Sequence, residues 1–61
     1  MIKRTYYLKN SQLLDDLLGF IGDTVPCFIE REFIEMDHRK VTLQFREADA
    51  PYITKQIALV S

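Results

Sequence analysis

The chain has 61 residues, of which 48% are hydrophobic and 28% charged, and its formal net charge at pH 7 is −1. A chain of this length forms one domain at most, spanning residues 1–61, and a domain this small buries only roughly 60% of the surface that its unfolded chain exposes. The near-neutral charge argues against the strongly basic field that supports non-specific nucleic-acid binding. Because small domains without disulfides or metals often complete their cores by oligomerising, we expect a partner, and self-association in particular.

The single cysteine, Cys27, cannot form a disulfide within the chain, and no charged-then-apolar signal segment opens the sequence. These features predict a reducing, cytoplasmic environment. The longest apolar cluster, residues 13–22, is interrupted by two aspartates and is far shorter than the roughly 20 residues that span a bilayer, so no membrane association is expected. Because the chain begins at Met1 and carries no recognisable tag, we take it as a complete small gene product.

A strand is predicted over residues 2–8, which are rich in β-branched and aromatic side chains. Alternation along the strand separates two sets of side chains, one made of Ile2, Arg4, Tyr6 and Leu8 and the other of Lys3, Thr5 and Tyr7. The polar residues that follow end this pattern. The side chain of Asn10 or Ser11 can cap a helix by accepting a hydrogen bond from a free backbone N–H in the first turn of that helix. We therefore expect a helix directly after the strand.

This amphipathic helix is predicted over about residues 11–21. At 100° per residue its apolar side chains fall within an arc of roughly 160°, formed by Leu13, Leu14, Leu17, Leu18, Phe20 and Ile21. The opposite side carries Gln12, Asp15, Asp16 and Gly19. Gly22 is predicted to end the helix in a left-handed turn. Because the arc is wider than one small sheet needs, part of it is expected to face another chain.

The segment from Cys27 to Met36 fits two periods. Ile29, Phe33 and Met36 have helical spacing, whereas strand alternation separates Cys27, Ile29, Arg31 and Phe33 from Phe28, Glu30, Glu32, Ile34 and Met36. We predict a strand because the following residues 40–45 alternate clearly, with Val41, Leu43 and Phe45 inward. The two strands would form a hairpin connected by residues 37–40, and a bulge near Glu30 to Glu32 would reconcile the mixed faces.

A second helix is predicted at the end of the chain, with Asp49 as its N-cap and Pro51 in its first turn. Its apolar face would carry Ala50, Ile53, Ile57 and Val60. The alternative is a short helical turn followed by a strand over residues 56–60.

The predicted order β–α–β–β–α is an α+β fold with a three-stranded sheet and two helices on one face. It resembles a truncated ferredoxin-like topology, in element order alone and without a sequence motif. Right-handed crossover places the third strand between the first and the second. The fourth strand that would cover the outer edge of the first strand is missing. An uncovered edge invites pairing with another chain, so residues 2–8 are the first candidate for a seam between two copies.

Residue patterns for chemistry are lacking: the sequence has no glycine-rich phosphate loop, no nucleophile elbow and no metal-binding histidine pair. We therefore expect no enzymatic activity, no cofactor and no metal. A cluster of titratable residues stands between positions 30 and 38, namely Glu30, Glu32, Glu35, Asp37 and His38. Because these residues fall on alternating faces or in a turn, they are interpreted as the solvated face of a hairpin. Cys27 is predicted to be a buried core residue rather than a nucleophile.

The functional prediction is a non-enzymatic regulator or inhibitor that acts through protein–protein contacts as a homodimer or higher oligomer. The candidate partner-binding residues lie on the first strand and the hairpin: Lys3, Arg4, Tyr6, Tyr7, Glu30, Glu32, Glu35, Asp37 and His38. At a strand edge, main-chain hydrogen bonds supply affinity and alternate side chains supply specificity. The short length also suits proteins of viral or mobile-element type that modulate a host target.

The alternative function is a nucleic-acid-binding regulator whose dimer pools the basic residues of two chains. Aromatic and basic side chains interleave on two strands taken as neighbours: Tyr6, Tyr7 and Phe28 with Lys3, Arg4, Lys9 and Arg31. On an open sheet such aromatics stack bases while the cations hold phosphates. Residues 40–45 lack the glycine and aromatic run of RNA-recognition sheets. Packing of the tyrosines at a sheet edge or subunit interface is therefore favoured.

Overall fold

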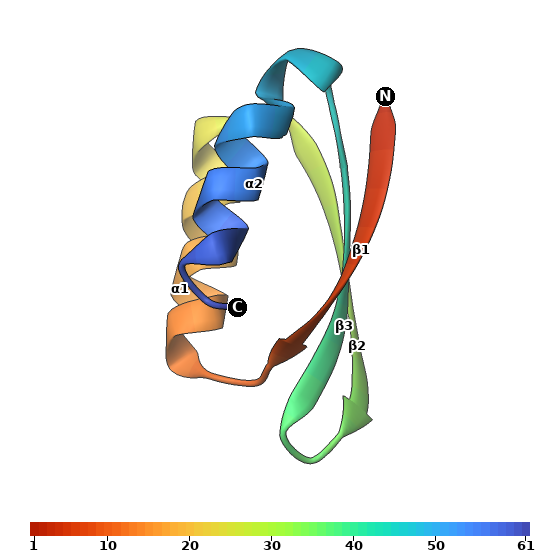
Figure 1. The fold of residues 1–61 in the computed structure, drawn as a ribbon, viewed down its shortest axis with the longest axis vertical. Coiled ribbons are helices and arrows are strands. Elements are labelled where there is room, and N and C mark those ends of the chain that lie inside the picture. Colours follow the sequence, from red (N-terminus) through yellow and green to blue (C-terminus); the bar gives the residue numbers. More distant parts are fainter.

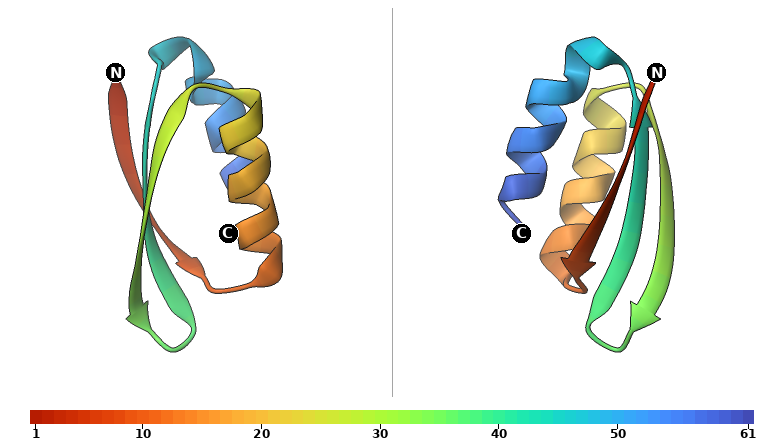
Figure 2. Two further views of the ribbon diagram at one scale, coloured as in Figure 1. Left: turned by 180° about the vertical axis from the view of Figure 1, so that it is seen from behind. Right: turned by 45° about the vertical axis from the view of Figure 1, so that its right-hand side comes forward.

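The fold, seen in a computed structural model that describes residues 1–61, has the predicted order β–α–β–β–α (Figure 1). Its elements are β1 (Ile2–Lys9), α1 (Gln12–Thr24), β2 (Cys27–Glu35), β3 (His38–Phe45), a 3-10 turn (Glu47–Asp49) and α2 (Ala50–Ala58). The sheet is antiparallel with strand order β1-β3-β2, so the third strand lies between the first and the second as predicted. Both helices cover one face of this sheet and leave the other face open (Figures 1 and 2).

The hydrophobic core lies between the sheet and the two helices. Its members are Leu8, Leu14, Leu17, Leu18, Ile21, Val41, Leu43, Phe45, Ile53 and Ile57. The central strand contributes Val41, Leu43 and Phe45, all with no exposed surface. Strands flank β3 on both sides and helices cover one face of it, which accounts for their complete burial. The alternation predicted for residues 40–45 is confirmed.

The first helix begins as predicted, but its end differs from the prediction. Ser11 is the N-cap, and its Oγ accepts a hydrogen bond of 3.1 Å from the backbone N–H of Leu14. The left-handed turn predicted at Gly22 is wrong, because no residue of the chain has a positive φ and α1 continues to Thr24. The helix ends where Val25 is extended, with φ −131° and ψ 149°, and proline at the next position disfavours helical backbone there.

Only part of the wide apolar arc of α1 is buried. The sheet and α2 cover Leu14, Leu17, Leu18 and Ile21. Leu13 and Phe20, at the border of the arc, are 59% and 57% exposed. The fold therefore hides the centre of the arc and leaves one flank in water.

The hairpin confirms a strand for residues 27–35 but differs from the prediction at its turn. The turn consists of Met36 and Asp37 rather than residues 37–40, because β3 begins at His38. The early start lets β3 pair with the whole length of β1, from Lys9 opposite His38 to Ile2 opposite Phe45. The irregularity in β2 lies between Phe33 and Glu35, so the bulge predicted near Glu30 to Glu32 is also misplaced.

The last element is a helix, and the alternative of a strand over residues 56–60 is wrong. Helical spacing buries Ile53 and Ile57 one turn apart, which a strand could not do. Asp49 is the N-cap residue of α2 as predicted, but its side chain makes no capping hydrogen bond, since its carboxylate accepts a hydrogen bond of 2.9 Å from Arg46 Nε. Neither helix of the chain has the length and apolar character needed to cross a membrane.

Candidate interaction surface

The hairpin formed by β2 and β3 extends past the end of the helix layer (Figure 1). Residues 30–38, here called the arm, are exposed without interruption. Three of them are apolar: Phe33, Ile34 and Met36 are 69%, 47% and 91% exposed. The charged residues of the arm are Glu30, Arg31, Glu32, Glu35 and Asp37. The arm is therefore an acidic hairpin with an apolar tip.

Local contacts fix the turn of the arm. The backbone N–H of Asn10, in the loop between β1 and α1, donates a hydrogen bond to the carbonyl of Asp37. The bulge adds one residue, Ile34, to β2 just before the turn. A bulge bends its strand and increases the local twist. The direction of the tip is therefore set on one side of the turn by the bulge in β2 and on the other by the hydrogen bond from Asn10 to Asp37.

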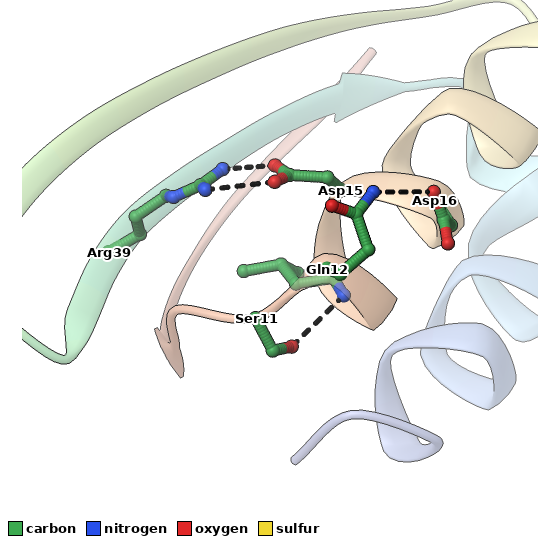
Figure 3. A network of polar contacts seen from close by, with 6 residues as sticks. Ser11, Gln12, Asp15, Asp16 and Arg39 are labelled. Atoms are coloured by element: carbon green, nitrogen blue, oxygen red, sulfur yellow. Dashed lines mark hydrogen bonds and ion pairs between the residues drawn. The ribbon is translucent and has the colours of Figure 1, made fainter.

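One buried arginine holds the arm against α1 close to the apolar tip. Arg39 lies on the helix-facing side of β3 and is 8% exposed. Its guanidinium donates to both carboxylate oxygens of Asp15, from Nη1 to Oδ1 and from Nη2 to Oδ2, the latter at 3.1 Å (Figure 3). Its central carbon lies 5.1 Å from the ring centroid of Phe33, within cation–π range. Arg39 thus connects α1, β3 and β2 next to the turn of the arm.

The charges of this pair are mutually stabilised. The hydrogen bond from Arg39 is the main cause that lowers the pKa of Asp15 from its ordinary value, against partial desolvation and with help from the charges of Arg39 and Arg31. The same hydrogen bond raises the pKa of Arg39. Arg39 Nε is buried without a hydrogen-bond partner. The pair therefore compensates the charge of the nearly buried Arg39 beside the turn of the arm.

Sequence reasoning missed this pair, although a signal was present. Asp15 was placed on the solvent side of its helix and Arg39 in a turn. Arg39 continues the inward positions of Val41, Leu43 and Phe45 with the same two-residue period. A charged side chain at an inward position requires a partner. This partner is Asp15, which lies beside the apolar arc of α1.

The candidate residues of β1 do not form one surface. The register with β3 places Lys3 and Tyr7 on the open face and Arg4 and Tyr6 on the helix face. Tyr7 is 67% exposed, whereas Tyr6 is half-buried and its hydroxyl has no hydrogen-bond partner. Arg4 Nη1 reaches α2 and donates to Thr54 Oγ1 at 3.3 Å.

The aromatic residues considered for base stacking do not converge. The strands taken as neighbours, β1 and β2, are separated by β3, so that expectation is wrong. On the open face Tyr7 lies opposite Lys40 of β3, while Phe28 lies opposite Gln44. Four residues along β3 correspond to about 13 Å. The aromatic side chains therefore do not build a continuous stacking platform.

The titratable residues between positions 30 and 38 are spread over the arm. No group of three or more His, Cys, Asp or Glu residues is placed to hold a metal ion. His38 belongs to β3 rather than to the turn, and lies between Lys9 and Glu35 in the strand register. These side chains are available to an external partner.

Cys27 is the first residue of β2. It was predicted to be buried, but it is only half-buried. It packs against the core as a partly buried residue. Burial raises the pKa of its thiol, and the negative charge of Asp49 adds to this effect. A raised pKa reduces the thiolate fraction, so the surroundings do not activate this sulfur.

The surface of the structure contains no pocket. Its distinctive features are the protruding arm and the two outer edges of the sheet. The chain matches no protein-family model, no curated protein and no solved structure. The arm and the outer edges of β1 and β2 are therefore the features from which a function can be argued.

Proposed function

We propose that the protein is a non-enzymatic binding protein that regulates a protein partner through direct contact with the arm. The observation that carries this proposal is the exposure of Phe33, Ile34 and Met36 at the tip of a protruding hairpin. Grouped apolar side chains on the surface of a small domain mark interaction sites. Covering them is favourable by roughly 25 cal/mol per Å² of apolar surface removed from water.

The charges around the tip define the chemistry of the partner. The arm carries four carboxylates against one arginine. A complementary surface has an apolar depression rimmed by lysine or arginine. In such a complex the apolar anchors supply most of the affinity, while the charges speed association and reject wrong partners.

The anchoring of the arm supports this function because the arm is held in place before binding. The Arg39–Asp15 pair and the hydrogen bond from Asn10 to Asp37 connect the arm to α1 and to the preceding loop. A contact surface that is already ordered loses less conformational entropy on association.

The test compares the arm with an equally apolar surface elsewhere. The double variant Phe33→Ser, Met36→Ser removes the tip, and Leu13→Ser, Phe20→Ser is its control because these side chains are 59% and 57% exposed on α1. Tagged wild-type protein captures partners from an extract of the organism that encodes it. Each captured partner is then purified and titrated against the three proteins by calorimetry.

The proposal predicts that the tip variant binds the partner at least about tenfold more weakly than the wild type, equivalent to ~1.4 kcal/mol, while the control stays within a factor of about two. Equal losses in both variants would indicate non-specific hydrophobic capture and contradict the proposal. Binding that survives the tip variant but not the control would move the contact surface to α1.

A further inference from the structure

The two outer edges of the sheet differ in how ready they are to pair. β2 carries a bulge between Phe33 and Glu35, and three glutamates lie along it. β1 pairs with β3 over all eight residues without a register shift and contains neither glycine nor proline. No element covers its outer side (Figure 2). A long, regular and uncovered edge is a template for another strand.

The residues of β1 are chemically self-complementary about Thr5. We propose that two copies of the chain pair through their β1 edges, antiparallel and related by a two-fold axis at Thr5, to form one six-stranded sheet. In this register Thr5 lies opposite Thr5 of the second copy, and the flanking pairs are Arg4 with Tyr6, Lys3 with Tyr7, and Ile2 with Leu8. Apolar residues meet apolar residues and each cation meets an aromatic ring, which are favourable cross-strand pairs.

The neighbouring symmetric registers are less favourable. A two-fold axis at Tyr6 places Lys3 opposite Lys9 of the second copy on both sides of the axis. An axis at Arg4 places two arginines directly opposite each other. Like charges in opposing positions destabilise a strand pair. With the axis at Thr5, no like charges lie directly opposite each other, and they meet only on diagonals, Arg4 with Arg4 of the second copy and Lys3 with Lys9.

The open face supports the same axis. Thr5 Oγ1 lies 3.3 Å from Thr42 Oγ1 on β3. Pairing at Thr5 extends this contact into a row of four threonines across the seam, and threonine pairs are favourable on a sheet face. A two-fold axis perpendicular to the sheet also keeps the helices of both copies on one side. This pairing is independent of any contact made by the arm.

Disulfide cross-linking tests the register directly. In a Cys27→Ser background, Thr5→Cys places two cysteines opposite each other, within the Cα separation of about 4.4–6.8 Å that a disulfide spans. Lys3→Cys or Tyr7→Cys alone places the two cysteines about 13 Å apart. In a mixture of the Lys3→Cys and Tyr7→Cys proteins, the cysteine at position 3 of one copy lies opposite the cysteine at position 7 of the other. All three side chains are exposed, so these substitutions leave the core intact.

The proposal predicts that under mild oxidant the Thr5→Cys protein, and the mixture, cross-link at least about tenfold faster than the Lys3→Cys or Tyr7→Cys protein alone. Equal rates for all single variants would overturn it. Sedimentation of the reduced proteins adds a second measurement: Thr5→Lys should weaken dimerisation at least about tenfold because two like charges would face each other. Phe28→Lys, which adds the same charge at a 65% exposed position of β2, two strands away from the seam, is the control. A wild type that sediments as a monomer at all concentrations would also overturn the proposal.

Discussion

Asp15 and Arg39 form the ion pair that attaches the arm to α1 beside its turn. The pKa of Asp15 is lowered in the folded chain, mainly by the hydrogen bond from Arg39. A group whose folded pKa is lowered contributes stability above its unfolded pKa, and that contribution is lost as pH falls through the folded pKa. The free energy of unfolding should therefore decrease as the pH falls below the ordinary value of 3.8 toward the lowered pKa.

The variant Asp15→Asn isolates this effect. It lacks the titrating carboxylate, so its stability should be lower at neutral pH, where Arg39 loses its charged partner, and should depend less on pH in the acidic range. Urea unfolding from about pH 6 to about pH 2 measures both proteins. Parallel pH profiles for the two proteins would show that the pair does not contribute to stability.

Gly19 is a residue at which the helix itself can be improved. It lies inside α1, and a Cβ atom added there meets no atom within 4 Å. Gly19→Ala should therefore raise the free energy of unfolding by roughly 0.5–1 kcal/mol, because alanine loses less backbone entropy in a helix. Denaturant unfolding gives the value. A loss of stability would mean that this position is not helical in solution.

At the scale of elements, α1 provides a buried and an exposed leucine in the same helix. Leu18 has no exposed surface, while Leu13 is 59% exposed. Leu18→Ala should lower the free energy of unfolding by about 2–5 kcal/mol, since it leaves a cavity in the core. Leu13→Ala should change it by about 0.5 kcal/mol or less. Similar losses for both variants, measured by denaturant unfolding, would show that the exposed flank of α1 is covered in solution.

Element types and the start of α1 could be predicted from the sequence, whereas the end of α1 and the turn of the hairpin could not. The two-residue period of Val41, Leu43 and Phe45 and the helical arc of α1 reflect burial against the core, and burial leaves a strong pattern. The turn at Met36 and Asp37 depends on how far β3 pairs with β1, which is a tertiary property. The end of α1 followed proline at position 26 rather than Gly22, because a glycine permits a left-handed turn without requiring one.

Part of the candidate surface could also be predicted from the sequence, and part of it could not. Glu30, Glu32, Glu35, Asp37 and His38 were predicted to be solvated, and all are exposed. The apolar tip was not predicted, because the exposure of Phe33, Ile34 and Met36 depends on where the helix layer ends. No local pattern records that boundary.

At the scale of the whole molecule, the proposed two-fold axis would place the two arms at opposite ends of the sheet, since Lys9 of β1 pairs with His38 beside the turn. A dimer would then offer two separate arm surfaces. On an immobilised partner the dimer should bind with avidity, whereas Thr5→Lys should retain only the affinity of one arm. Surface binding compared with solution titration measures this difference. Equal retention of both proteins on the surface would contradict a two-armed assembly.

The arm is proposed to be the surface that contacts a protein partner. Amide hydrogen exchange of the complete chain, with and without the purified partner, tests it most directly because every backbone segment is observed at once. Slower exchange is expected on binding in residues 30–38, together with unchanged exchange around Leu13 and Phe20. Protection confined to α1 or β1, with the arm unchanged, would contradict it.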